Sequence, residues 1–491
     1  MSEKNYFENS VFTYYVTNKD STDFGLNEKY QTSGWHIFAS CETKVRIFEN
    51  SPSDSVAIIG YCIDSHGDLN AEEIPEYLAL LDDAEFFVQL ARFAGKYVIL
   101  KTDEDDLCAY TDATASLPAF YSRKNELTCI SSNEYFVKNI VDANEDARIF
   151  KVLKKADGAK TLPGSMSHYD GVFALLPNNY YSYFENKAIR YNLYEPPEIF
   201  SSQDAAKNAS KLIENVVNSI ARDYEIKFPL TGGYDSRVVL AVLNSVKYNL
   251  DEIYTMRHQN SLGADDISIP AKIAADYGIN HILLEDKLPS GEQKSVADHV
   301  FGKDFYSKRT LDIVITLKDY IKKGCILNGD IMGQIGKSSL HRSIPESFMG
   351  PRYYRCKIHN TSNTALSETK KWYKDIKSSG VENICDSFSQ EIRLGRWAAD
   401  ENSMYSLFGI NVINCFNCHE IIKLFREVPR KERKLSKLHK ELIGIFDKNL
   451  LDYSFGAEKM NLESLARKID IGFYIATFAK YYIQVIKNIK G

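Results

Sequence analysis

The stretch LTGGYDSR, residues 230–237, brings two aliphatic hydroxyls, paired glycines, an acid and a base together at one turn of the chain. It follows the run IKFP (226–229), which predicts a strand, and it precedes VVLAVLNSV (238–246), which predicts a helix. Paired glycines let a ligand approach the backbone, and the unpaired N–H groups of a helix N-terminus attract anions. Asp235 would repel a phosphate unless a Mg²⁺ ion bridged the two. The pattern predicts a phosphate or pyrophosphate site, and a plain capped turn between strand and helix is the alternative.

The elements expected around this turn place it at the edge of a parallel sheet. A long amphipathic helix (204–224) precedes it, and a strand (252–256), a helix (269–278) and another strand (281–285) follow. Strands that alternate with helices form parallel sheets covered by helices, and such sheets bind ligands at the carboxyl ends of their strands. From about residue 340 onward the chain reads as mostly helical and charged.

The N-terminal part of the chain follows a different pattern. Short β-favouring runs such as SVAIIGYCI (55–63) and KYVILKT (96–102) are separated by polar turns, and one helix is expected within 72–93. The proline-rich, acidic joint EPPEIF (195–200) then separates this part from the alternating one. We therefore expect an α/β protein with two domains, residues 1–197 and 198–491.

The glycine turn resembles the pyrophosphate loop S-G-G-x-D-S of the ATP pyrophosphatase (PP-loop) superfamily, with Thr231 in place of the first serine. Residues 254–285 resemble the second nucleotide-binding segment of the asparagine synthetase-like family in that superfamily. Residues 93–132 and 171–196 are similar to the glutaminase-type domain that precedes the synthetase domain there. The resemblance implies an N-terminal αββα sandwich of the Ntn glutaminase type, then a parallel-sheet α/β ATP-pyrophosphatase domain with a helical C-terminal region.

The resemblance also implies the residues that bind ATP and Mg²⁺. The expected nucleotide-binding residues are Leu230, Thr231, Gly232, Gly233, Asp235, Ser236, Arg237, Thr255, Met256, Arg257, Asp266 and Gly329. The expected metal ligands are Asp235 and Asp330. For Asp266 and its neighbour Asp265, the alternative is acidic charge that complements the dipole at a helix N-terminus.

The loop CILNGDIMGQIGKSS (325–339) departs from the S-G-x-G-x-D-E pattern that is usual in this family. Gly333 stands at the aspartate position and Gln334 at the glutamate position, and glutamine cannot act as a general base. Asp330 is then expected to supply a metal ligand from a shifted place, and Lys337 to stabilise phosphate charge. The expected catalytic set is Asp330, Gln334, Lys337 and Lys459. Lys459 falls where a lysine often faces the acyl-adenylate or its leaving group, and a surface lysine without catalytic contact is the alternative.

A second departure concerns the amino group that the reaction uses. Glutaminases of this type need a cysteine directly after the initiator methionine, and this chain has Ser2, so we expect no glutamine hydrolysis. The family then implies an ATP-dependent amide-bond ligase that releases AMP and pyrophosphate and joins a carboxylate to an amine donor through an acyl-adenylate. Lactam synthetases and peptide macrocyclases are relatives of this kind, so a peptide is a candidate substrate, and amidation of a surface-glycan sugar acid is another candidate. The alternative is a catalytically impaired homologue that binds nucleotide or a partner protein without turnover.

Composition limits the other classes of function. The net charge is −6, with 60 basic and 66 acidic residues, so no nucleic-acid partner is expected. Nine scattered cysteines and an N-terminus without an apolar signal segment predict a cytoplasmic protein with reduced thiols. No apolar run reaches the roughly 18 residues of a membrane span. The C-terminal stretch (471–491) predicts an amphipathic helix that packs on the protein or lies on a membrane surface, and the basic run 429–440 predicts a solvated helix face. A homodimer or a biosynthetic partner protein remains open.

Overall fold

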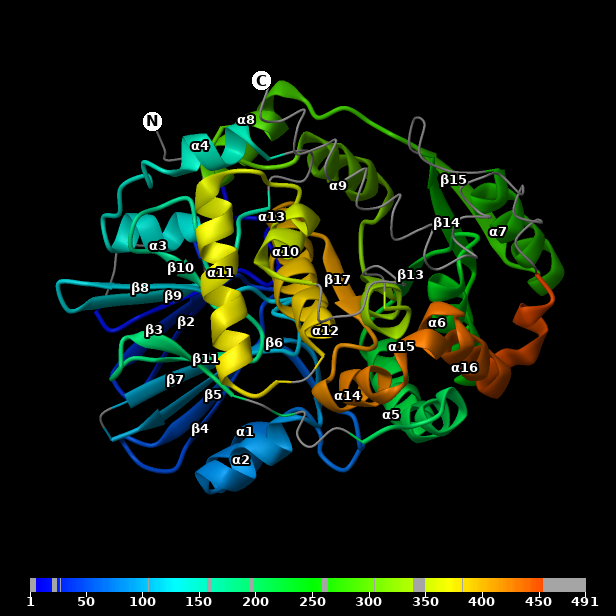
Figure 1. The fold of residues 1–491 in the computed structure, drawn as a ribbon, viewed down its shortest axis with the longest axis horizontal. Coiled ribbons are helices and arrows are strands. Elements are labelled where there is room, and N and C mark those ends of the chain that lie inside the picture. The colour runs from blue at the N-terminus through cyan, green and yellow to red at the C-terminus, as the bar shows by residue number, and fades with distance from the viewer. Residues whose placement is uncertain are drawn as a thin grey trace.

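The computed structural model describes residues 6–19, 24–26, 28–104, 106–156, 161–191, 193, 198–257, 264–303, 305–338, 349–381 and 383–453. Figure 1 shows the antiparallel strands gathered on one side of the molecule and the parallel strands on the other, with helices over both. The expectation of a mixed α/β fold that contains a parallel sheet is confirmed.

The N-terminal part contains two antiparallel sheets of six strands each, as far as the chain is described. In order across the first sheet, the strands are β10 (Phe173–Ala174), β8 (Phe120–Lys124), β9 (Leu127–Ser131), β1 (Tyr14–Thr17), β3 (Trp35–Ala39) and β2 (Glu28–Thr32). Across the second sheet they are β12 (Lys187–Arg190), β11 (Asn179–Ser182), β7 (Asp106–Thr111), β6 (Phe93–Asp103), β5 (Ser55–Asp64) and β4 (Val45–Glu49).

The central strand β5 shows how the layers hold together, because all ten of its residues are buried. Alternate side chains, such as Ala57 and Ile59, enter the core that the two sheets share. The intervening ones, such as Val56 and Ile58, pack against the helices α1 (Ile74–Ala79) and α2 (Asp83–Leu90). On the far face of the first sheet, α3 (Glu134–Ile140) packs against β8 and β9, and α4 (Ile149–Lys154) follows it. Two sheets therefore lie between helices.

The single helix expected within 72–93 is wrong, because two short helices occupy that segment. Asp82 follows α1 and is the N-cap of α2. Its carboxylate accepts a hydrogen bond of 2.9 Å from the backbone N–H of Glu85. Aspartate at this position satisfies an N–H group that would otherwise lack a partner, so the chain starts a new helix there.

The C-terminal part is built on a five-stranded parallel sheet. Its order is β15 (Asn280–Glu285), β14 (Glu252–Arg257), β13 (Ile226–Pro229), β16 (Cys325–Asn328) and β17 (Asn411–Asn414). The strands expected at 252–256 and 281–285 are confirmed by β14 and β15, and the helix expected at 204–224 is confirmed by α5 (Ser202–Asp223). The helix expected at 269–278 begins earlier, since α7 covers Ala264–Tyr277. The strand β17 interrupts the region that the sequence predicted as mostly helical.

Helices cover both faces of this sheet. On one face α5, α6 (Tyr234–Ser245) and α16 (Lys437–Asp447) pack against one another. The other face carries α8 (Gly291–Phe301), α9 (Lys308–Tyr320) and α13 (Ala399–Leu407). The other helical segments are η1 (Met332–Gly336), α10 (Pro351–Lys357), α11 (Asn363–Ser378), α12 (Ile384–Phe388), η3 (Ser389–Ala398), α14 (His419–Glu427), α15 (Arg430–Lys434) and η4 (Lys448–Leu451).

One buried side chain joins the two parts of the molecule. The amide nitrogen of Asn417, just beyond β17, donates to the Asp112 carboxylate at 2.7 Å and to the Gly95 carbonyl at 2.6 Å. Its amide oxygen accepts a hydrogen bond from Thr114 at 3.0 Å. The residues that surround Asp112 therefore support the chain segment that follows the parallel sheet.

Within the part of the chain that the structure describes, no helix is long and apolar enough to cross a membrane. The C-terminal segment expected as an amphipathic helix (471–491) lies outside the described residues.

Candidate active site

A cavity opens at the carboxyl edge of the parallel sheet, next to the ends of β13 and β16. From β13 the chain proceeds to β14 and β15 on one side, and it then crosses to β16 and β17 on the other, so the strand order changes direction here. Open α/β sheets bind ligands at such switch points. The cavity has a volume of about 290 Å³. It is lined by Leu230, Thr231, Thr255, Met256, Asn328, Asp330, Thr114, Ser116, Glu401, Asn402 and Tyr405, among others.

The loop between β13 and α6 is held closed by its two hydroxyls. The Thr231 and Ser236 hydroxyl oxygens lie 3.2 Å apart, and the backbone N–H of Thr231 also donates to Ser236 at 3.2 Å. Gly233 is the N-cap of α6 and offers no side chain to cap the helix. The N-terminal N–H groups of α6 are therefore left to other acceptors, as an anion site requires.

Gly232 lies where the loop meets the start of α7. A Cβ atom at this position would come within 2.7 Å of the Asp265 carbonyl oxygen and 3.4 Å of the Asp266 Cα. The close approach requires glycine, because the atoms it would meet are backbone. Asp265 and Asp266 stand in the first turn of α7, which agrees with their alternative role as charges at a helix N-terminus. Neither residue borders the cavity.

Arg237 points away from the cavity. Its side chain is fully buried, and the guanidinium donates to the carbonyls of Gly232 at 2.8 Å and Gly233 at 3.2 Å. It also donates to the carbonyls of Leu450, at 3.2 Å, and Tyr453. The arginine therefore braces the glycine turn from behind against the end of α16 and η4, and it adds no cation to the cavity.

Asp235 is fixed by a histidine from α16. His439 Nε2 lies 2.7 Å from Asp235 Oδ1, and the imidazole is fully buried. Burial raises the pKa of Asp235, but the hydrogen bond and charge of His439, together with the charge of Lys337, outweigh it and hold the pKa below its ordinary value. The other oxygen, Oδ2, would lie 2.9 Å from a Cβ atom at Gly333. The missing side chain at 333 thus leaves room for the Asp235 carboxylate.

Asp330 faces the cavity from the end of β16. Its carboxylate accepts a hydrogen bond of 3.0 Å from the Asn328 side chain. The surrounding protein and the negative charge of Asp235 raise the pKa of Asp330 to about 6. Gly329, between Asn328 and Asp330, is packed against α6, since a Cβ there would meet Val239 at 2.9 Å. It supports the loop and does not border the cavity.

Gln334 and Lys337 lie at the π-helical turn η1 that follows Asp330, and neither borders the cavity. Lys337 is half-buried and close enough for its charge to lower the pKa of Asp235. Lys337 therefore stands near Asp235, and both residues lie outside the cavity wall. Lys459 and Ser2 lie outside the described residues.

The end of β14 contributes one side of the cavity. The Thr255 hydroxyl donates to the Leu230 carbonyl at 2.7 Å and lies 2.9 Å from His281 Nε2, so it ties β14 to the glycine turn. Met256 borders the cavity, whereas Arg257 is exposed and lies 3.3 Å from Glu285. The structure does not bring Arg257 to the cavity.

Sequence reasoning missed the histidine that positions Asp235. His439 belongs to the basic run 429–440. The prediction of a solvated helix face there holds for the exposed Lys431, Lys437 and Lys440 but not for the buried Arg433 and His439. Arg433 in the same run is fully buried and pairs with Asp386 at 2.7 Å. A histidine among leucines and lysines carries no signal of a partner 204 residues away in the chain.

The carboxylates Asp235 and Asp330 are the candidates for holding Mg²⁺. Among the described residues, no group of three or more His, Cys, Asp or Glu side chains could hold a metal ion. Mg²⁺ in nucleotide sites is usually held by one or two carboxylates, with waters and phosphate oxygens completing the shell. Desolvation by the protein, and then the negative charge of Asp235, raise the pKa of Asp330, so the pair fits a divalent cation that arrives with a polyphosphate.

Comparisons with known proteins find no matching family model and no matching curated protein. Among solved structures, an allosteric regulatory enzyme of purine biosynthesis matches with 7% identity and a TM-score of 0.25, over 60% of this chain and 83% of that one. Glutamine phosphoribosylpyrophosphate amidotransferase from B. subtilis, complexed with ADP and GMP, matches with 9% identity and a TM-score of 0.21, over 74% of each chain. Likeness this low carries no argument, so the function of this chain rests on its own residues.

Proposed function

We propose that the chain is an asparagine synthetase-like ligase that uses ATP to form an amide bond and releases AMP and pyrophosphate. One observation carries the proposal. Thr231, in the turn that leads to the uncapped N-terminus of α6, and Asp330 come from adjacent strand ends, and both border the switch-point cavity, which is large enough for a small-molecule site. A phosphate-binding turn beside an acid is the arrangement that a nucleotide with its metal requires.

In this proposal, each group of site residues binds a different part of the ATP–Mg²⁺ complex. The N–H groups at the start of α6 and the hydroxyls of Thr231 and Ser236 bind the departing pyrophosphate. Asp235, oriented by His439, and Asp330 would hold Mg²⁺, which would supply charge neutralisation of the phosphates. The walls at Thr255 and Met256 receive the nucleoside. Catalysis then comes from positioning the carboxylate substrate against the α-phosphate, with little proton transfer required in the first step.

The amine arrives without glutamine hydrolysis in this proposal, because position 2 is serine. Residues of the N-terminal sandwich, Thr114 and Ser116, border the same cavity. The sandwich then serves as one wall of the substrate site, and the amine donor is a separate molecule or part of the carboxylate substrate, with a peptide among the candidates.

Pyrophosphate release tests this proposal. The full-length protein is incubated with ATP, Mg²⁺ and pools of carboxylic acids and amines, and pyrophosphate is measured by a coupled assay. We expect release that depends on a carboxylate pool, that stops when EDTA removes Mg²⁺, and that Asp235→Ala abolishes. The matched control is Asp170→Ala, since Asp170 is exposed and its side chain makes no hydrogen bond with a described residue. Wild-type activity in Asp235→Ala would overturn the site assignment.

Gly333 and Gln334 favour a second candidate, a homologue that binds nucleotide without turnover, because they replace the acids expected in this loop. ATP binding in calorimetry, without pyrophosphate from any substrate pool, would support it. Failure to bind ATP at all would overturn both candidates.

A further inference from the structure

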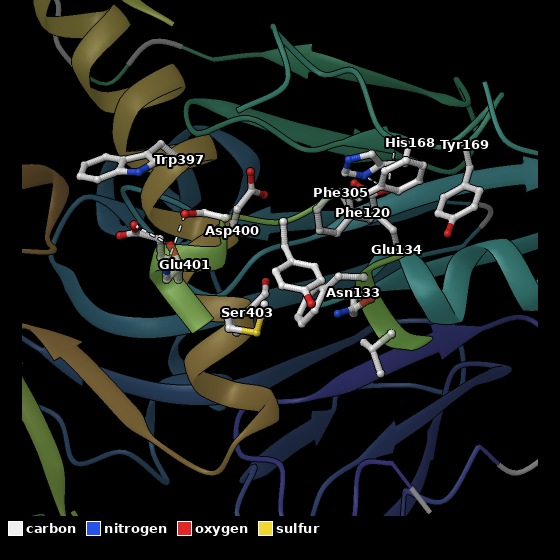
Figure 2. Close-up of a pocket in the computed structure, with 16 residues that line it drawn as sticks. Phe120, Asn133, Glu134, His168, Tyr169, Phe305, Trp397, Asp400, Glu401 and Ser403 are labelled. Atoms are coloured by element: carbon white, nitrogen blue, oxygen red, sulfur yellow. Dashed lines mark hydrogen bonds and ion pairs between the residues drawn. The ribbon is translucent and has the colours of Figure 1, made fainter. Parts of the chain in front are cut away.

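A second cavity, of about 70 Å³, adjoins the nucleotide cavity, and Glu401 borders both. Figure 2 shows Phe120 and Phe305 on one side of it and Trp397, Asp400 and Glu401 on the other. A water molecule needs about 10–15 Å³ of such volume, so the cavity accepts a group several times larger. Its aromatic walls meet two carboxylates, and this combination is the feature that needs explanation.

Asp400 and Glu401 have no cation in direct contact within the described chain. Neither forms an ion pair there, and the closest polar contact of Glu401 is a hydrogen bond of 3.3 Å from the Thr310 hydroxyl. Asp400 keeps exposed surface, but the surrounding protein raises the pKa of its carboxyl to about 6 against the opposing charges of Arg396 and His168. Confinement and the charge of Asp330 raise the pKa of Glu401 to about 7. The charges of Arg396 and Arg309 oppose these shifts only in part, so a cation in direct contact would stabilise both carboxylates further.

The exposed Arg309 lowers the pKa of Glu401 without forming an ion pair with it. The two cations that act on Asp400 are engaged elsewhere. Arg396 donates to the Met166 carbonyl at 2.8 Å and stacks over Phe120. His168 lies 3.0 Å from Glu134 and holds the pKa of that buried carboxyl below its ordinary value, although burial alone would raise it. Glu134 is therefore compensated, in contrast to Asp400 and Glu401.

A helix-dipole role does not account for these acids. Acidic residues are common in the first turn of a helix, where they meet unpaired N–H groups. However, α12, η3 and α13 follow one another without a break from Ile384 to Leu407, so Asp400 and Glu401 stand in the interior of a continuous helical segment. The π-helical stretch η3 immediately before them is a form that occurs frequently at functional sites.

We propose that this second cavity binds the ammonium group of an amine, held by Asp400 and Glu401 and enclosed by the rings of Trp397 and Phe305. Aromatic faces attract cations within about 6 Å, and the attraction grows when water is excluded. Glu401 links the cavity to the proposed nucleotide site, so the amine stands next to the place where an acyl-adenylate would form. The role as amine substrate rests on the proposed ligase function, whereas binding of the cation does not.

Calorimetric titration of the full chain without ATP tests the cation site. Butylammonium is the probe, and butanol, which has the same alkyl chain and no charge, is its neutral counterpart. We expect butylammonium to bind at least tenfold more tightly than butanol, and Asp400→Asn and Glu401→Gln each to reduce its affinity at least tenfold. Asp170→Asn and Glu8→Gln, which change exposed acids that no described side chain pairs closely, should leave it unchanged. Equal affinities for the two probes, or undiminished binding in both cavity variants, would overturn the proposal.

Thermal unfolding separates loss of binding from loss of structure. Because each substitution removes a carboxylate whose charged form the surrounding protein disfavours, Asp400→Asn and Glu401→Gln should unfold at the same or a higher temperature while binding less butylammonium. A large drop in the unfolding temperature of both variants would show that the two acids stabilise the fold, and it would count against a binding role. Butylammonium binding without pyrophosphate release would uphold this site and remove the ligase function, and the reverse result would do the opposite.

Discussion

Substitution of Gly333 by alanine tests how the structure positions Asp235. The new Cβ would lie 2.9 Å from Asp235 Oδ2, whereas ordinary contact begins at about 3.4 Å. The carboxylate must then move by about 0.5 Å, which lengthens its hydrogen bond with His439 from 2.7 Å toward the upper limit of about 3.2 Å. A weakened hydrogen bond to a charged group costs about 1.5–3 kcal/mol. We expect Gly333→Ala to reduce Mg²⁺-dependent ATP affinity by about 10- to 100-fold.

The same turn provides the control. Gly336→Ala adds a methyl group to η1 as well, but its Cβ meets the Met332 methyl at 2.9 Å, the far end of a flexible side chain that can move aside. Both variants remove a glycine from a helical turn, so backbone effects cancel in the comparison. ATP affinity is measured by calorimetry at saturating Mg²⁺, and unfolding by circular dichroism. If Gly333→Ala binds ATP as tightly as Gly336→Ala does, then Asp235 does not contribute to nucleotide binding in the way we infer.

Three further changes are expected to have distinct effects. Arg237→Met leaves buried carbonyls behind the glycine turn without a donor, at about 1–3 kcal/mol per group, so guanidinium titration should find a free energy of unfolding lower by about 3 kcal/mol or more. The folded protein binds the Asp330 proton more tightly than the unfolded chain does, so the free energy of unfolding falls as the pH rises from about 4 to about 6. Urea titrations across that range should show a shallower fall for Asp330→Asn than for the wild type. Asn417→Ala removes a donor from buried Asp112 and should lower the thermal midpoint, and an unchanged midpoint would show that this contact does not stabilise the junction.

The parallel sheet could be predicted from the sequence because its signals are local. Strands such as 252–256 and 281–285 are short apolar runs beside helices with helical spacing, and β14 and β15 lie where these runs predicted them. The helix boundary at Asp82 was missed because the apolar spacing continues across it, so a capping residue within a periodic stretch gave too weak a signal.

In the candidate site, too, some features could be predicted from the sequence and others could not. The resemblance selected residues that border the cavity, such as Thr231 and Asp330. It also selected Arg237, whose direction depends on carbonyls near residue 450 that no local pattern reveals. The hydrogen bond between His439 and Asp235 and the cavity that Asp400 shares with Phe120 and Phe305 both arise from packing between distant segments. No spacing in the sequence indicates them.

The substitution at position 333 bears on whether this site has lost its function. Read from the sequence, glycine in place of an acid indicates a missing metal ligand. In the folded chain, the space that a side chain at 333 would enter is next to the Asp235 carboxylate, and Asp330 stands close enough to Asp235 for their charges to interact. The local negative charge is thus supplied by two residues that reach the same region from different strand ends. An acid restored at 333 would add a third carboxylate beside that pair and would raise the pKa of both residues, so the glycine is consistent with a rearranged site as well as with an impaired one.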